Sequence, residues 1–414
     1  MSIGSRSFVT AAMAGAVSLF SGAAQAQTSG SPSPPVTAGW NDGFVIQSAD
    51  GSHRLQLGAV FQADGRFSLD DPPPFIDTFA IRKARPVFSG RISRLFDFRL
   101  MPEFAGGSAQ LLDAYFDIRL ATAFRIRSGK DKTPIGYELL LGDPTLIFPE
   151  RSVVSLLVPN RDVGFQVQGE RPDGRIRYSG GVFNGQPADG SSSTTDSDTN
   201  DGKDLAGRIV VLPFAFAKGL PPVLARLGFH LGASTGNQSG ALATYRTATG
   251  DAFFTYAGTT ADGRRNRVTP ALLLYTGRFG AFAEYARSSQ RVLHAGANTT
   301  VANDAWQVTA SYVLTGESTS ERGVRPRTPF DPAKRQWGAV LIAARYGELR
   351  FDDENFTAAL AAAGSVRCAR QATVGVDWFL SDYIKLYGTF ERVAFDEGSR
   401  DAEHSIIFRA QLAF

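Results

Sequence analysis

The segment that decides the fold reads His404-Ser405-Ile406-Ile407-Phe408-Arg409-Ala410-Gln411-Leu412-Ala413-Phe414. Positions 406, 408, 410, 412 and 414 are apolar, whereas positions 405, 409 and 411 between them are polar. Alternation with a period of two predicts a β-strand with one apolar and one polar face. Such a strand fits the wall of a membrane barrel, and its soluble alternative is the edge strand of a β-sandwich.

The same alternation recurs upstream. Leu55, Leu57 and Phe61 lie on one face of a predicted strand, and Gln62 and Asp64 lie on the other. An apolar face opposite a charged face suits a wall between lipid and water. Sixteen segments have this character: 54–67, 83–92, 96–104, 111–120, 124–129, 163–169, 175–183, 205–212, 227–234, 267–276, 280–289, 306–314, 337–351, 371–379, 384–395 and 404–414.

The N-terminal residues predict export. Arg6 precedes an apolar run, and Ala24-Gln25-Ala26 forms an A-x-A cleavage site. We therefore expect a cleaved signal peptide at 1–26, a Ser/Pro/Gly-rich tether at 27–39 and a barrel domain at 40–414. No later stretch reaches the roughly 18 uninterrupted apolar residues of a membrane helix. Because bilayers admit only helices or closed barrels, the sequence predicts an all-β fold, a 16-stranded antiparallel transmembrane β-barrel in the bacterial outer membrane.

Composition excludes several other classes. The 43 basic residues nearly balance 40 acidic ones, which argues against a nucleic-acid binder. Only seven of the basic residues are Lys, a skew that reflects either anionic ligands or the base composition of the genome. The single Cys368 excludes a disulfide framework and a thiolate metal site. Gly232-Ala233-Ser234-Thr235-Gly236 matches G-x-S-x-G only formally, because it ends a predicted strand, so we expect neither an enzyme, nor a cofactor, nor a metal.

Connection lengths orient the predicted barrel. Tight turns at 93–95, 278–279 and 381–383 are typical of the periplasmic side, and an even strand number places both ends there. Longer polar connections at 68–78, 184–204, 235–266 and 396–403 are assigned to the extracellular side. The connection 316–336 is long yet falls on the periplasmic side. It is either a genuine long turn or a sign that the strand register slips.

The connection between the fifth and sixth strands, 130–160, is too apolar for a solvent-exposed loop. It contains apolar residues throughout its length, including Ile135, Leu139, Val154 and Leu157. We expect it to fold into the barrel and constrict the lumen. The alternative is a latch that faces a neighbouring subunit of a trimer.

Short motifs along the chain carry a resemblance to a known family. They are Lys132-Thr133-Pro134-Ile135-Gly136-Tyr137-Glu138, Phe148-Pro149-Glu150-Arg151-Ser152 and Arg161-Asp162-Val163-Gly164, with Ile81-Arg82-Lys83-Ala84-Arg85, Leu112-Asp113-Ala114-Tyr115 and Gly181-Val182-Phe183-Asn184-Gly185 elsewhere. In this order they resemble the phosphate-selective porin O and P family, and the terminal aromatic resembles the assembly signal of outer-membrane barrels. The resemblance implies a trimeric, sixteen-stranded porin whose narrow zone holds a phosphate.

The resemblance also implies which residues line that zone. Motif by motif, it assigns Arg66, Arg82, Lys83, Asp113 and Arg151 to anion binding. It also assigns Lys132, near the start of the connection 130–160. Forked guanidinium donors can replace water stripped from an oxyanion, and several weak sites in series permit exit as well as entry.

Strand parity gives a partly independent prediction. It points Lys83, Arg85 and Arg91 into the lumen, whereas Arg82 has the wrong parity and lies at the extracellular end of its strand, where alternation often lapses. Arg125 and Arg127 alternate with apolar residues and are also expected to line the lumen. Their alternative role is in scaffold ion pairs with Asp113, Asp117 or Glu103.

Two departures weaken phosphate as the substrate. Leu139 and Lys83 stand where phosphate-selective members carry Lys and Arg, and the fifth extracellular loop holds only Arg246 before the cluster at 264, 265 and 267. The sequence therefore predicts a homotrimeric porin in outer-membrane lipid that passes inorganic phosphate or other small anions by diffusion and binds no nucleic acid. The alternative is a general, weakly selective porin. A structural or adhesive barrel is disfavoured because no loop has the size of a separate domain.

Overall fold

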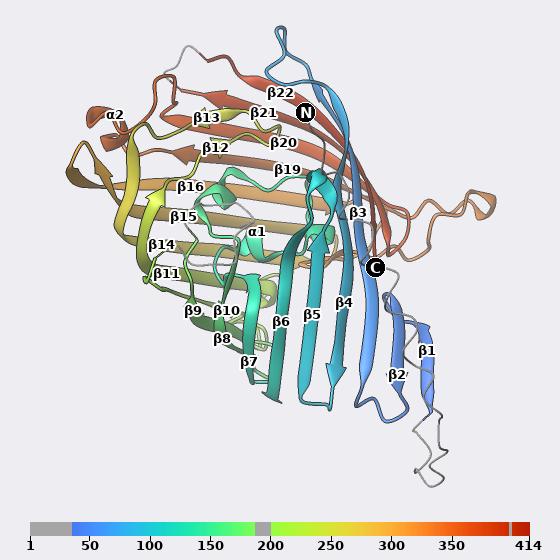
Figure 1. Cartoon of the computed structure of the whole chain (residues 1–414). Helices are drawn as coiled ribbons and strands as arrows, with labels where there is room; N and C mark the ends of the chain where they lie inside the picture. The colour runs from blue at the N-terminus through green and yellow to red at the C-terminus, as the bar shows by residue number, and fades with distance from the viewer. Residues whose placement is uncertain (1–34, 187–199, 397–399) are drawn as a thin grey trace, which may run out of the picture.

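Sixteen antiparallel strands close into a barrel in the structure, a computed structural model that describes residues 35–186, 200–396 and 400–414 (Figure 1). β22 pairs with β3 from Ser405–Ser68 to Ala413–Val60, which closes the sheet. The sixteen predicted strands are confirmed. Their bounds are β3 (Arg54–Ser68), β4 (Thr78–Ile92), β5 (Phe96–Glu103), β6 (Gln110–Ala121), β7 (Phe124–Lys132), β8 (Arg161–Glu170), β9 (Ile176–Phe183), β10 (Asp204–Val211), β11 (Leu227–Ala241), β14 (Thr259–Thr276), β15 (Phe279–His294), β16 (Ala297–Val313), β19 (Ala339–Arg350), β20 (Cys368–Phe379), β21 (Ile384–Phe395) and β22 (Glu403–Ala413).

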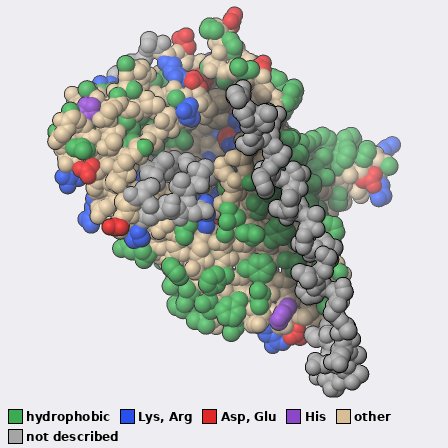
Figure 2. Space-filling view, viewed as in Figure 1, with side chains coloured by type: hydrophobic (Ala, Val, Ile, Leu, Met, Phe, Trp, Pro, Cys, Tyr) green, Lys and Arg blue, Asp and Glu red, His purple; other side chains and the backbone are tan. Residues whose placement is uncertain are grey.

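Alternating exposure follows the sequence pattern. On β22, Phe408 is 54% exposed on the outer face, whereas its neighbour Arg409 is 3% exposed and points inward. In the space-filling view, apolar side chains gather over the lower part of the outer wall, and charged side chains lie at the upper-left rim (Figure 2). The described residues include no helix long and apolar enough to cross a bilayer.

A hairpin extends the sheet beyond the barrel. β1 (Val36–Trp40) pairs with β2 (Phe44–Ser48), and β2 pairs with the first residues of β3. Residues 36–39 of the predicted tether are therefore paired in a strand. Trp40 and Phe44 pack against Phe414. The predicted signal peptide and most of the tether lie outside the described residues.

The long periplasmic connection is genuine. β16 and β19 pair from Asp304–Arg350 to Val313–Leu341 without a register shift, so residues 314–338 join them at the end that carries the short turns. This connection contains the short strands β17 (Thr319–Ser320) and β18 (Gly323–Val324) and the 3₁₀ turn Pro332–Lys334.

Extracellular connections differ from the expectation in one respect. The connection between β11 and β14 was predicted at 235–266 but is shorter in the structure. The two strands continue their pairing from Thr235–Asn266 to Ala241–Thr260. The remainder of the connection forms β12 (Tyr245–Arg246) and β13 (Ala252–Phe254), whose aromatic residues are buried. α2 (Glu354–Thr357) and the 3₁₀ turns Ala105–Gly107 and Leu224–Arg226 lie in other connections, and most of 184–204 lies outside the described residues.

The connection after β7 folds into the barrel, as predicted. It contains α1 (Tyr137–Leu140) and two 3₁₀ turns, Asp143–Thr145 and Val153–Leu157. Ile135, Val154 and Leu157 are at most 1% exposed, and they cluster with small side chains of the inner wall such as Ala286 and Ala305. This burial inside the lumen does not fit the subunit latch. We call residues 133–160 the inward loop.

Candidate functional site: a charged constriction

The inward loop divides the lumen beside β3, β4 and β6 into two chambers. The extracellular chamber has a volume of about 510 Å³ and carries seven cationic side chains against two carboxylates. These are Arg66, Arg82, Lys83, Arg85, Arg151, Arg161 and Arg246 against Asp143 and Glu150.

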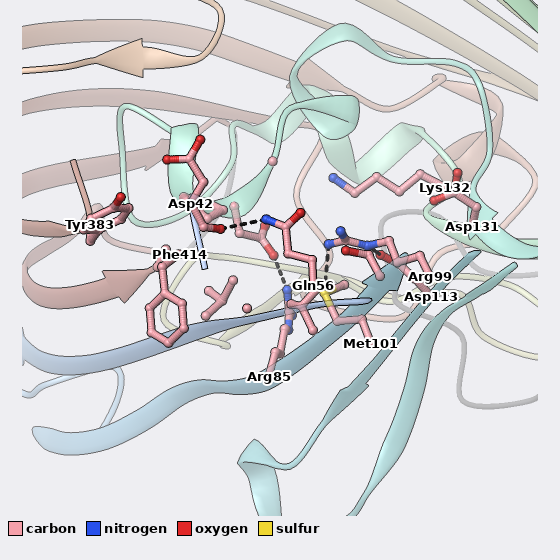
Figure 3. Close-up of a pocket in the computed structure, with 18 of the residues that line it drawn as sticks. Asp42, Gln56, Arg85, Arg99, Met101, Asp113, Asp131, Lys132, Tyr383 and Phe414 are labelled. Atoms are coloured by element: carbon pink, nitrogen blue, oxygen red, sulfur yellow. Dashed lines mark hydrogen bonds and ion pairs between the residues drawn. The ribbon is translucent and has the colours of Figure 1, made fainter. Parts of the chain in front are cut away.

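The periplasmic chamber is balanced in charge. Its volume is about 450 Å³, and its lining carries five cationic and five acidic side chains. Figure 3 shows several of them: Arg85, Arg99 and Asp113 extend from wall strands, and Lys132 lies nearer the inward loop. Arg85, Asp143 and Arg161 line both chambers, so they mark the passage between them.

Asp143 lies at the centre of this passage. Its carboxylate is 2.9 Å from Lys83 Nζ and 2.8 Å from Arg151 Nη2, and it also contacts Arg85. Burial alone would raise the pKa of Asp143, but these cations outweigh it and hold that pKa well below its ordinary value. The carboxylate is therefore charged throughout the physiological pH range.

Glu150 forms a second junction nearer the extracellular side. Its two oxygens lie 2.9 Å from Arg82 Nε and 3.3 Å from Arg82 Nη2, a forked contact. Arg409 is 3.2 Å away, and Arg66 also contacts it. Burial opposes ionisation, but the three guanidinium groups prevail and hold the pKa of Glu150 well below its ordinary value.

Asp113 and Lys132 hold other parts of the constriction. Asp113 Oδ1 is 2.7 Å from Arg161 Nε, and Asp113 Oδ2 is 3.0 Å from Arg99 Nε. Lys132 Nζ donates to the carbonyl oxygens of Leu139 at 2.7 Å and Leu141 at 2.8 Å. Lys132 thus stabilises the turn of the inward loop while it lines the periplasmic chamber.

The parity of Arg82 has a structural explanation. Gln62 pairs with Lys83 but Ala63 pairs with Ile81, so Arg82 is the extra residue of a β-bulge. The bulge lets Arg82 and Lys83, which are consecutive, both reach the inward loop. Sequence alternation alone had placed Arg82 on the wrong face.

Arg125 and Arg127 lie outside the two chambers. Arg127 forms a fork with Asp117, with an Nε to Oδ1 distance of 2.6 Å, and its guanidinium lies 3.6 Å from the centre of the Tyr115 ring. It also contacts Asp131. This geometry favours the scaffold alternative for Arg127.

Sequence reasoning did not assign four charged residues at the constriction: Asp143, Glu150, Arg161 and Arg409. Glu150 and Arg161 belong to the family motifs at 148–152 and 161–164, and the alternation of β22 points Arg409 inward. The sequence therefore contained evidence for three of the four. Asp143 had no such signal, because a carboxylate in an irregular loop has no periodic neighbours.

The formal G-x-S-x-G match does not form a nucleophile elbow. Ser234 lies within β11, where backbone pairing continues on both sides and no strand-to-helix turn occurs. The described residues contain no cluster of three His, Cys, Asp or Glu side chains that could hold a metal.

The fold and its constricted lumen define an outer-membrane β-barrel of the porin class. Residues 55–414 match the family described as phosphate-selective porin O and P. The chain therefore belongs to this family and is a porin of the outer membrane.

Solved structures share the fold at low sequence identity. The trimer form of Vibrio cholerae OmpT aligns with a TM-score of 0.56 and 10% identity, covering 88% of this chain and 100% of that one. An anion-selective porin from Comamonas acidovorans aligns with a TM-score of 0.54 and 12% identity over 87% and 100% of the two chains. Pseudomonas putida OprB gives a TM-score of 0.54 and 12% identity over 88% and 95%. Comparison with curated proteins gave no match.

Proposed function

We propose that this porin passes inorganic phosphate or similar small anions by passive diffusion through a cation-lined constriction. The observation that carries the proposal is the cationic lining of the extracellular chamber, where seven cationic side chains face two carboxylates. A surplus of positive charge remains when the pairs of Arg66, Arg85 and Arg161 with Asp64, Glu103 and Asp113 are counted as well. Fixed positive charge in a narrow, low-dielectric passage concentrates anions and repels cations.

We assign anion contact to Arg66, Arg82, Lys83, Arg85 and Arg151, which line the extracellular chamber. Asp113 and Lys132 act from the periplasmic chamber, where Asp113 orients Arg161. Arg125 and Arg127 contribute at most to the field, because they line neither chamber.

The proposal includes a homotrimer surrounded by outer-membrane lipid and a signal peptide cleaved after Ala26. The trimer form of the similarly folded Vibrio cholerae protein supports the first point. The A-x-A sequence at 24–26 supports the second.

A general porin of weak selectivity is the second candidate. The five-to-five charge balance of the periplasmic chamber favours it, as does Leu139, an apolar residue in the lining of the extracellular chamber.

Planar bilayer recording separates the two functions. The reversal potential under a potassium chloride gradient gives the ratio of anion to cation permeability, and added phosphate tests for block of the chloride current. Anion preference with block supports the proposed function. Weak selectivity without block supports the general porin instead.

A further inference from the structure

The two carboxylates of the inward loop occupy the cation clusters that line the extracellular chamber. Asp143 meets Lys83, Arg85 and Arg151, and Glu150 meets Arg66 and Arg82 of the chamber lining together with Arg409. In each junction, carboxylate oxygens of the protein accept hydrogen bonds from N–H donors. A permeating oxyanion would need the same donors.

These carboxylates are not required to position most of the cations. Arg66 and Arg409 also contact Asp64, with distances of 2.8 Å and 2.6 Å. Arg82 differs from Arg66 and Arg409. Among the described residues, Glu150 is its one ion-pair partner within 4.0 Å, and its side chain is 43% exposed.

The Asp143 junction is built the same way. Arg85 Nε lies 2.5 Å from Glu103, and Arg151 donates to the Leu141 carbonyl oxygen at 3.0 Å. Both guanidinium groups would keep a partner without Asp143. Lys83, like Arg82, has a loop carboxylate as its one ion-pair partner among the described residues. The loop carboxylates thus contact four guanidinium groups that neighbouring groups also hold, and two cations that only the loop carboxylates pair.

We propose that Asp143 and Glu150 are tethered competitors: a permeating oxyanion must displace them from the cations, so they weaken its binding and speed its release. This inference rests on the proposed function and names two residues that set its selectivity. The anion it favours is one that accepts several hydrogen bonds at once, as phosphate does.

Competition has a simple quantitative form. If a tethered carboxylate occupies a cluster nine-tenths of the time, a free anion binds about tenfold more weakly than it would to the open cluster. A group held on a short tether competes at an effective concentration on the order of millimolar. Weak binding at sites in series allows exit as well as entry, which a diffusion pore requires.

The test uses Glu150→Gln and Asp143→Asn in the full-length protein, with inorganic phosphate as the blocker of chloride current. Removing the competing charge should lower the half-blocking phosphate concentration by roughly threefold to tenfold, the range set by the occupancy argument. The ratio of anion to cation permeability should rise in the same variants. Heat-modifiable gel mobility confirms that each barrel is folded.

Glu138→Gln is the matched control. Glu138 belongs to the same loop and lines neither chamber. Its carboxylate accepts from Ser152 of the loop at 2.7 Å, and from Gln307 and Arg345 of the wall at 3.0 Å and 3.4 Å. The substitution Glu138→Gln should loosen the inward loop without exposing the cation clusters. Single-channel conductance should therefore change more than the half-blocking phosphate concentration.

The outcomes separate the two ideas. A wild-type pore without anion preference would overturn the proposed function. An anion-selective wild type whose block is unchanged or weaker in both variants would overturn the competition alone, since the carboxylates would then be holding the cations in place. An equal gain of block in Glu138→Gln would also overturn it, because loosening of the loop would account for the effect.

Discussion

Arg82 and Lys83 are consecutive residues, yet each reaches a different carboxylate of the inward loop. Arg82 Nε lies 2.9 Å from Glu150, and Lys83 Nζ lies 2.9 Å from Asp143. In a regular strand the two side chains would point to opposite faces. The β-bulge between Gln62 and Ala63 of the partner strand removes that restriction, so one short segment supplies cations to both junctions.

Neutralising Lys83 should reduce anion selectivity. In Lys83→Gln, Asp143 keeps Arg85 and Arg151 as partners, so the loop stays docked while the passage loses one positive charge. The reversal potential should shift toward cation permeability, and Arg151→Gln should act in the same direction. Lys334→Gln is the control, because Lys334 is 71% exposed in the periplasmic connection and lines neither chamber. Unchanged ion preference in both lumen variants would remove these residues from the site.

Gly136 is required where the inward loop begins. Its φ is +77°, and an added Cβ would lie 2.5 Å from Val158 Cγ1. Gly136→Ala therefore combines backbone strain at positive φ, about 1–3 kcal/mol, with a steric clash. We expect a loosened loop, seen as faster hydrogen exchange at 137–157 and noisier single-channel current. Adding Val158→Ala relieves the clash alone, so it should restore the loop only in part; full restoration would show that φ is not the constraint.

The ion pairs of the loop should resist acidification. The pKa values of Asp143 and Glu150 are depressed in the folded protein, so both carboxylates contribute their full stabilisation above the ordinary carboxyl pKa of roughly 4. That contribution is lost only as the pH falls well below it, through the depressed values. Hydrogen exchange of the loop should keep a constant protection, after correction for the intrinsic rate, between about pH 6 and 5. A loss of protection near pH 5 would contradict these shifts, and Asp143→Asn should show less change at acidic pH than the wild type.

Phe414 should stabilise the junction between the hairpin and the barrel. Its ring centre lies 5.2 Å from that of Trp40, and its backbone pairs with Ala59 in both directions. Trp40→Ala and Phe414→Ala should each lower the free energy of unfolding, with a coupling between them of about 0.5–1.5 kcal/mol, as found for aromatic pairs. Urea titration of the two variants and the double variant measures that coupling. Strict additivity would show that the two rings act independently.

The strands could be predicted from the sequence because a barrel wall imposes alternation on each one. Parity also predicted that Lys83 and Arg85 face the lumen, and both line the extracellular chamber. It failed at Arg82, since a bulge is a property of two paired strands and leaves no mark in the alternation of one.

The loops were harder to predict, because their partners come from distant parts of the chain. Glu150 meets Arg409, which lies 259 residues away in sequence. Tyr245 and Phe254 were hidden in a connection that looks polar on average, although they pack together at a ring distance of 5.7 Å. Apolar content predicted that the inward loop folds inside, but not which of its carboxylates would face the wall cations.

The unequal charge of the two chambers makes the pore electrically asymmetric. Under the proposed function, the extracellular chamber should carry current mainly as anions, whereas the balanced periplasmic chamber should admit both signs. When the voltage drives anions inward, ions accumulate at the junction and conductance rises; when it drives them outward, the junction is depleted. We expect a rectifying current–voltage curve at roughly 0.01 M salt, where the screening length is about 30 Å, and a nearly linear one at 1 M, where it is about 3 Å.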